Sequence, residues 1–132
     1  MTNPKSFDAN ASKAAKAADS TESTAYNLVK VRVIYAVFPD AKMAGEVARS
    51  AVEKRLAACA NVFTPHVSVY RWKDTVETSE EVAVLFKTSA DKSSELIDFI
   101  RTNHSYETPA ILDFPVSNSN PDFANWIFDS CR

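Results

Sequence analysis

The sequence predicts an α+β fold in which two helices cover one face of a four-stranded antiparallel sheet, with an extra C-terminal helix. Apolar residues alternate in some segments, as in strands, and recur at helical spacing in others. These segments follow the order strand, helix, strand, strand, helix, strand, helix. The chain has 132 residues, of which 45% are hydrophobic, and this suits one domain with one core.

Residues 1–27 are predicted to be a flexible N-terminal tail, and residues 28–132 the folded domain. The tail is rich in Ala, Ser, Lys and Thr, and Phe7 and Tyr26 are its only large apolar side chains. Such a segment buries too little surface to offset the entropy lost on ordering. An Ala-rich helix within residues 9–18 is the alternative, because Ala is the best helix former.

The first strand and the first helix are predicted on either side of Pro39. From Leu28 onward, valines alternate with basic residues, and Pro39 ends this strand. Asp40 then offers its side chain as the N-cap of a helix. Apolar residues follow at helical spacing as far as Leu56, so this helix buries one stripe.

An extended hairpin is predicted from the second and third strands. The second is expected to be a long strand from Asn61 to Trp72, and the third to run from Glu81 to Thr88, with Asp74 in the turn between them. Pro65 cannot donate to a ladder, so it indicates a bend or an edge. Strand alternation places Val67 and Val69 on one face and His66, Ser68, Tyr70 and Trp72 on the other.

The remaining elements complete a ferredoxin-like arrangement. Asp91 is predicted to cap a second helix, and residues 110–116 to form a short fourth strand. Asn120 followed by Pro121 is a typical helix start and predicts the C-terminal helix. The first six elements have the βαββαβ order of ferredoxin-like folds. That fold hosts many functions, so function must come from individual residues.

The composition excludes several classes of function. The net charge of −2, without a block of like charges, argues against nucleic acid or an anionic membrane as a partner. Gly45 is the single glycine, which excludes glycine-rich phosphate and dinucleotide loops. No apolar run approaches the roughly 18 residues of a membrane span. Cys59 and Cys131 are far apart in sequence and are interpreted as thiols in a reducing compartment, so a cytoplasmic location is expected.

Three residues are candidates for metal ligands, and each has an ordinary structural interpretation as well. Cys59, flanked by small apolar residues, is either a buried packing thiol or a soft ligand suited to Cu(I). Glu81, at a strand end, is either solvated or an oxygen ligand. His104 either bonds the last carbonyls of the second helix or offers an imidazole to copper or zinc.

Other candidate residues carry a weaker signal. His66 is interpreted as a strand residue that packs near Tyr70, and Tyr70 with Trp72 as core or interface rather than a stacking platform for a ligand. The chain lacks a local metal motif such as Cys-x-x-Cys, so a metal site has to be assembled from distant segments or across subunits. It also lacks a constellation of acid, base and nucleophile, so no enzymatic activity is predicted.

Several segments resemble the CutA divalent-cation tolerance family, in the same order and with similar gaps. Residues 54–61 (KRLAACAN) are similar to the family signature around Cys59, residues 68–72 (SVYRW) to its second strand, and residues 104–109 (HSYETP) to its His-Pro-Tyr-x-x-Pro segment. Glu81 and Trp126 also stand at matching positions. Ser105 replaces the usual Pro after the histidine, and Asp74 replaces the usual Gly in the hairpin turn.

The resemblance implies a homotrimer in which long hairpins pair with neighbouring subunits. It also implies a role in tolerance of divalent cations, copper being the metal attributed to members of the family. By motif position, Cys59, Glu81 and His104 are the candidate ligands, and Tyr106 or Trp72 is expected near a cleft between subunits.

Three functional hypotheses follow. The first is a trimer that binds or responds to a metal. The second is a signalling module like the PII proteins, with a nucleotide or small anion in the clefts between subunits, although a basic or glycine-rich loop is lacking. The third is an interaction scaffold that holds a protein partner and no ligand.

Overall fold

The structure, a computed structural model, describes residues 31–132. The predicted tail, residues 1–27, and the predicted start of the first strand at Leu28 lie outside the described residues.

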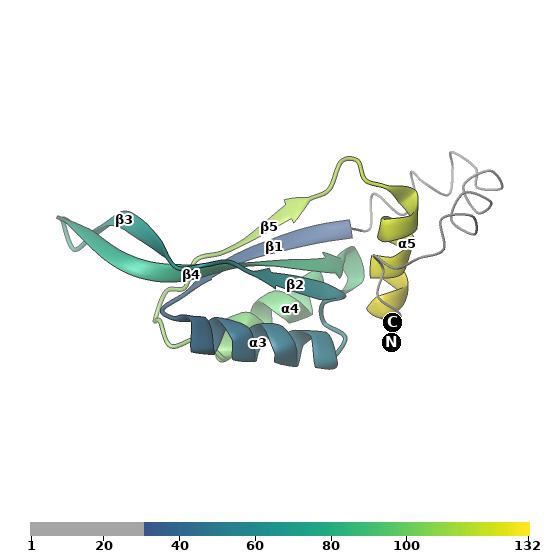
Figure 1. Cartoon of the computed structure of the whole chain (residues 1–132), viewed down its shortest axis with the longest axis horizontal. Helices are drawn as coiled ribbons and strands as arrows, with labels where there is room; N and C mark the ends of the chain where they lie inside the picture. The colour runs from purple at the N-terminus through teal and green to yellow at the C-terminus, as the bar shows by residue number, and fades with distance from the viewer. Residues whose placement is uncertain (1–30) are drawn as a thin grey trace.

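Five antiparallel strands and three helices make up the described part of the chain, which confirms the α+β prediction (Figure 1). The strands are β1 (Val31–Phe38), β2 (Cys59–Val62), β3 (His66–Trp72), β4 (Thr75–Ser89) and β5 (Ile111–Pro115). The helices are α3 (Ala41–Glu53), α4 (Ala90–Thr102) and α5 (Pro121–Ser130). The strand order is β2-β4-β1-β5, and β3 pairs with the outer half of β4.

The main core lies between the sheet and the pair α3 and α4, which cover the same face (Figure 1). Alternate strand residues point into it, and the two helices contribute their apolar stripes. Its fully buried members include Ile34, Ala36, Phe38, Val82, Val84, Phe86, Ala44, Ala51, Leu96 and Ile100. The apolar side chains that alternate along the strands and those that recur at helical spacing therefore pack together in one layer.

Two of the three predicted helix starts are confirmed. Asp40 caps α3 by accepting a hydrogen bond from the amide of Met43 (2.8 Å), and Asn120 caps α5 by accepting one from the amide of Asp122 (3.0 Å). The prediction for Asp91 was wrong. Ser89 is the N-cap of α4, because β4 runs directly into the helix, and Asp91 lies in the first turn, where its negative charge suits the helix dipole.

The predicted long strand from Asn61 to Trp72 is divided into β2 and β3. Val62 pairs with Val84 and His66 pairs with Glu81, so the three residues Phe63–Pro65 face only two residues of β4. This extra residue is a β-bulge, which bends a strand and raises its twist. The bend indicated by Pro65 therefore lies where the hairpin leaves the sheet.

The third strand is longer than predicted. β4 begins at Thr75, although alternating apolar residues start only at Val82. The polar outer half is extended because it pairs with β3 along its whole length, from Trp72 opposite Thr75 to His66 opposite Glu81. The resulting β3–β4 hairpin projects well beyond the rest of the molecule (Figure 1).

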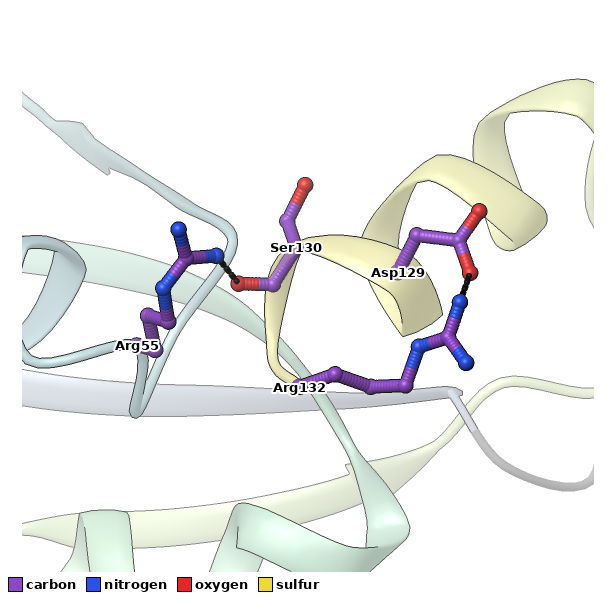
Figure 2. Close-up of polar contacts among 4 residues, drawn as sticks. All are labelled: Arg55, Asp129, Ser130 and Arg132. Atoms are coloured by element: carbon purple, nitrogen blue, oxygen red, sulfur yellow. Dashed lines mark hydrogen bonds and ion pairs between the residues drawn. The ribbon is translucent and has the colours of Figure 1, made fainter.

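Helix α5 packs at the opposite end of the sheet through a second apolar cluster. Val31, Ala58, Ala124, Ile127 and Cys131 are its buried members. Figure 2 shows the polar contacts beside it: the guanidinium of Arg55 donates to the carbonyl of Ser130 (3.3 Å), and Arg132 pairs with Asp129 (2.7 Å). The first contact connects the end of α5 to the loop after α3, and the second lies within the C-terminal end of the chain.

None of the helices in residues 31–132 has both the length and the apolar character needed to cross a membrane.

Candidate functional site

The candidate site is a group of polar side chains where the hairpin leaves the sheet. We call Glu81, Tyr106, His104 and His66 the neck cluster. Glu81 lies on β4 immediately before Val82, which is the first residue of that strand to pair with β1. His104 and Tyr106 come from the loop between α4 and β5. Segments far apart in sequence therefore meet at the base of the hairpin.

Tyr106 connects this loop to the hairpin. Its hydroxyl donates to Oε2 of Glu81 at 2.8 Å. Desolvation by partial burial, and then the hydrogen bond and the negative charge of Glu81, raise the pKa of Tyr106 from 10.0 to about 12. Tyr106 therefore remains a neutral donor at physiological pH, and one carboxylate oxygen of Glu81 is held in place.

Both ring nitrogens of His104 have partners in the backbone. Nε2 lies 2.6 Å from the carbonyl of Val37, and Nδ1 lies 3.1 Å from the amide nitrogen of Tyr106. A carbonyl only accepts and an amide only donates, so the ring is the tautomer protonated at Nε2. The ring also stacks on Phe38, with centroids 4.8 Å apart. His104 therefore holds the loop against β1, which places Tyr106 opposite Glu81.

His66 lies directly across the ladder from Glu81, in the first pair of β3 with β4. Side chains of directly opposed residues point to the same face of a sheet. The Nε2 atom of His66 is 2.9 Å from the hydroxyl of Ser68, two residues along the same face. Further along, the hydroxyl of Ser79 donates to that of Tyr70 (3.2 Å), so polar side chains continue up this face.

The structure brings two of the three predicted metal ligands together and places the third elsewhere. Glu81 and His104 meet through Tyr106. Cys59 is half-buried on β2, where it pairs with Lys87 of β4. Lys87 is six residues from Glu81 along β4, so Cys59 and Glu81 are about 20 Å apart at strand spacing. Within residues 31–132, no group of three or more His, Cys, Asp and Glu side chains is arranged to hold a metal ion.

Sequence reasoning missed the proximity of His66 and Glu81. In an unbroken strand from Asn61 to Trp72, His66 lies on the opposite face from Asn61. The bulge at Phe63–Pro65 shifts the alternation by one residue, so His66 and Asn61 lie on the same face of the sheet. This is also the face of Glu81, which pairs with His66. The Pro65 signal indicated a bend, but not the change of face.

Two apolar surfaces remain exposed. On β5, Leu112 and Phe114 are 54% and 49% exposed. They are paired with Tyr35 and Val33, on the face of the sheet that α3 and α4 leave uncovered. On the hairpin, Val67 and Val69 are 67% and 68% exposed, and Trp72 is exposed beside the turn.

An open groove of about 430 Å³ lies between the end of α3 and α4. Lys54, Glu95, Asp98 and Phe99 are among its lining residues. It includes no member of the neck cluster.

Comparison with protein families gives one clear match. The model of the CutA1 divalent ion tolerance proteins matches residues 32–130. This covers both the βαββαβ part and α5, and it includes all four residues of the neck cluster.

Named relatives agree with this match. The divalent-cation tolerance protein CutA of Thermotoga maritima is 40% identical over 98 residues, which are 74% of this chain and 96% of that protein. Protein CutA of Mus musculus is 37% identical over 97 residues, again 74% of this chain. The chain spans only 55% of the mouse protein and 60% of human protein CutA, both of which are longer.

Solved structures have the same fold. CutA from Xylella fastidiosa superposes with a TM-score of 0.76 at 32% identity, over 78% of this chain and 99% of that one. A structure from Archaeoglobus fulgidus, described as a periplasmic divalent cation tolerance protein, gives 0.75 at 33% identity, over 77% and 99%. In sequence and in fold, the chain belongs to the CutA1 divalent ion tolerance protein family.

Proposed function

We propose that this chain is a homotrimeric protein of divalent-cation tolerance that acts by binding the ion, copper being the leading candidate. The observation that carries the proposal is the neck cluster, in which Tyr106 contacts His104 and positions one oxygen of the Glu81 carboxylate at the base of the hairpin. Imidazole and carboxylate groups are suitable ligands for first-row divalent metals. The family to which the chain belongs is named for tolerance of such ions.

The three predicted ligands have different roles in this proposal. Glu81 is the primary ligand, because only one of its oxygens is needed to accept from Tyr106. His104 becomes a ligand only when its ring leaves Val37 or the amide of Tyr106. Cys59, about 20 Å from Glu81 in the same subunit, reaches such a site only from a neighbouring subunit.

The exposed apolar surfaces support the trimer. A hairpin with valines exposed on one face and a sheet face with Leu112 and Phe114 exposed are surfaces that a monomer rarely leaves open. Among residues 31–132, no strand pairs with the outer edge of β5, and such an edge invites further strand pairing. Association of three copies covers such surfaces and brings the neck of one subunit close to the sheet of another.

The proposal assigns no catalytic role to the neck cluster. In it, Tyr106 and His104 hold each other and Glu81 in position. We place the protein in the cytoplasm, where a thiol such as Cys59 stays reduced and available to copper.

Native mass spectrometry with and without stoichiometric Cu(II) tests the proposal. The expected result is a trimer that takes up a whole number of copper ions per subunit. Glu81→Gln should reduce the uptake without changing the trimer. The control is Glu95→Gln in the groove between α3 and α4, which should bind copper as the parent does. A trimer without copper above background would contradict the metal function, and a monomer would contradict the assembly.

A small-ligand function is the second candidate. The exposed rings of Tyr70, Trp72 and Tyr106 favour it, because aromatic faces at a cleft between subunits suit a planar ligand. A thermal-shift screen with ATP and small carboxylic acids checks this alternative. Stabilisation by one of them that persists in Glu81→Gln would favour small-ligand binding over metal binding.

A further inference from the structure

We propose that His66 and Glu81 together form a transition-metal site across the β3–β4 ladder. The inference deepens the proposed function, on which it rests, by naming a second ligand beside Glu81. His66 is not among the three residues assigned from the family resemblance. The site consists of one imidazole and one carboxylate, both half-buried, at the base of the hairpin.

The register of the hairpin brings the two side chains together. His66 and Glu81 are directly opposite in the antiparallel pair, so their Cβ atoms are about 4.5–5.5 Å apart on the same face. An imidazole and a carboxylate that start at this separation can bind the same ion. The two-residue turn and the pairing of β3 with β4 along its whole length hold this register, so the pair is positioned before an ion arrives.

Each side chain also has an outer partner of the kind that metal ligands use. The hydroxyl of Ser68, 2.9 Å from Nε2 of His66, can accept the Nε2 proton, which leaves Nδ1 with a lone pair for the ion. The hydroxyl of Tyr106 donates to Oε2 of Glu81, which leaves Oε1 for the ion. Outer hydrogen bonds of this type orient ligands and raise the affinity for metal.

Cu(II) is the ion that this pair favours most. Among divalent first-row metals, Cu(II) binds nitrogen and oxygen donors most tightly. Two protein ligands leave its other positions to water or to a small anion. Such a site exchanges its ion readily, which suits a protein that responds to metal rather than one that stores it.

Titration of the full-length protein with Cu(II), followed by calorimetry and electron paramagnetic resonance, tests the inference. We expect His66→Ala and Glu81→Gln each to weaken binding at least about tenfold, and Ser68→Ala to weaken it by about tenfold as the loss of an outer partner. The resonance spectrum of the parent should show coupling to an imidazole nitrogen, and that coupling should disappear in His66→Ala.

Glu80→Gln is the matched control, because Glu80 is adjacent on β4 but paired with Val67 on the other face. It should bind copper as the parent does. Parent-like affinity and nitrogen coupling in His66→Ala would overturn the inference. If His66→Ala bound copper as the parent does but His104→Gln or Cys59→Ser lost binding, the proposed metal function would stand and the His66 site would not. A parent protein that binds no copper would overturn both.

Discussion

Tyr106 is the residue on which the neck cluster depends, because it holds Glu81 and receives its own position from His104. Its raised pKa has a consequence for stability at high pH. The folded chain keeps the phenolic proton to a pH of about 12, whereas the unfolded chain releases it near 10.0. The stabilisation is therefore complete below pH 10 and is lost as the pH rises towards 12.

We expect the stability of the parent protein to fall more steeply between pH 10 and pH 12 than that of Tyr106→Phe, which has no proton to lose. Chemical denaturation at a series of pH values measures the difference, and ultraviolet absorbance follows phenolate formation. Parallel pH profiles for the two proteins would show that Tyr106 is not linked to folding.

Thr88 is a second residue with a specific role, because its hydroxyl is buried between three elements. It donates to the carbonyl of Leu56 at 2.6 Å and lies 3.7 Å from the sulfur of Cys131. Thr88→Val keeps the shape but removes the donor. We expect a loss of about 1–3 kcal/mol in the free energy of unfolding, the cost of a buried group without its partner. Denaturation by urea at a fixed protein concentration measures it.

Thr88→Ser is the control for that change. It retains the hydroxyl and removes only a methyl group, so its loss should be about 1 kcal/mol. A larger loss in Thr88→Ser than in Thr88→Val would mean that packing at this position matters more than the hydrogen bond to Leu56.

The two histidines show which features of single residues could be predicted from the sequence. The position of His104 after α4 was predicted, but its bond to Val37, 67 residues away in sequence, depends on the tertiary structure. His66 was interpreted as a packing residue. Its place opposite Glu81 depends on the pairing of β3 with β4, which no local pattern around Pro65 reveals.

Among the elements, the β3–β4 hairpin has two consecutive residues of positive φ in its turn. Lys73 and Asp74 both have positive φ, at 50° and 65°, as in the two-residue turns that match strand twist. Neither residue is glycine, the residue that adopts positive φ most readily. We expect Asp74→Gly to stabilise the fold by about 0.5 kcal/mol, because glycine adopts this conformation without a steric cost.

Arg71→Gly provides the comparison, since Arg71 lies in the regular ladder opposite Val76. There glycine should cost about 0.5–1 kcal/mol, because it loses more entropy on folding. Thermal unfolding of both variants measures the two effects. Destabilisation by Asp74→Gly comparable to that of Arg71→Gly would show that the turn is not strained.

The helices and inner strands were predictable because each buries its own apolar stripe, as Leu96 and Ile100 do on α4. The outer half of β4 was not, because Glu77 and Thr78 carry no apolar alternation. These residues are extended through their pairing with Tyr70 and Val69. A strand of this kind is specified by its partner, and single-segment patterns do not detect it.

For the whole molecule, the sheet face left open by α3 and α4 leads to a prediction about assembly. Leu112 and Phe114 are exposed there, on the outermost strand. We expect Leu112→Ser combined with Phe114→Ser to dissociate the proposed trimer into monomers, because the apolar contact between subunits is lost. Native mass spectrometry and light scattering measure the mass in solution.

Lys42→Ala combined with Glu46→Ala is the matched control on the opposite side. These two residues form an exposed ion pair on α3, so their removal should leave the mass unchanged. A trimer that survives the change at Leu112 and Phe114 would place the contact between subunits on the hairpin instead.

The bulge at Phe63–Pro65 has a consequence for variation in chain length. The register of β2 and the register of the hairpin are each held independently, and the three bulge residues absorb the difference between them. Deleting Thr64 would give a continuous ladder with every buried side chain retained, but the hairpin would leave the sheet in a new direction. One-residue insertions and deletions should therefore be tolerated here, and each would set a different geometry between neighbouring copies while the hydrophobic core stays the same.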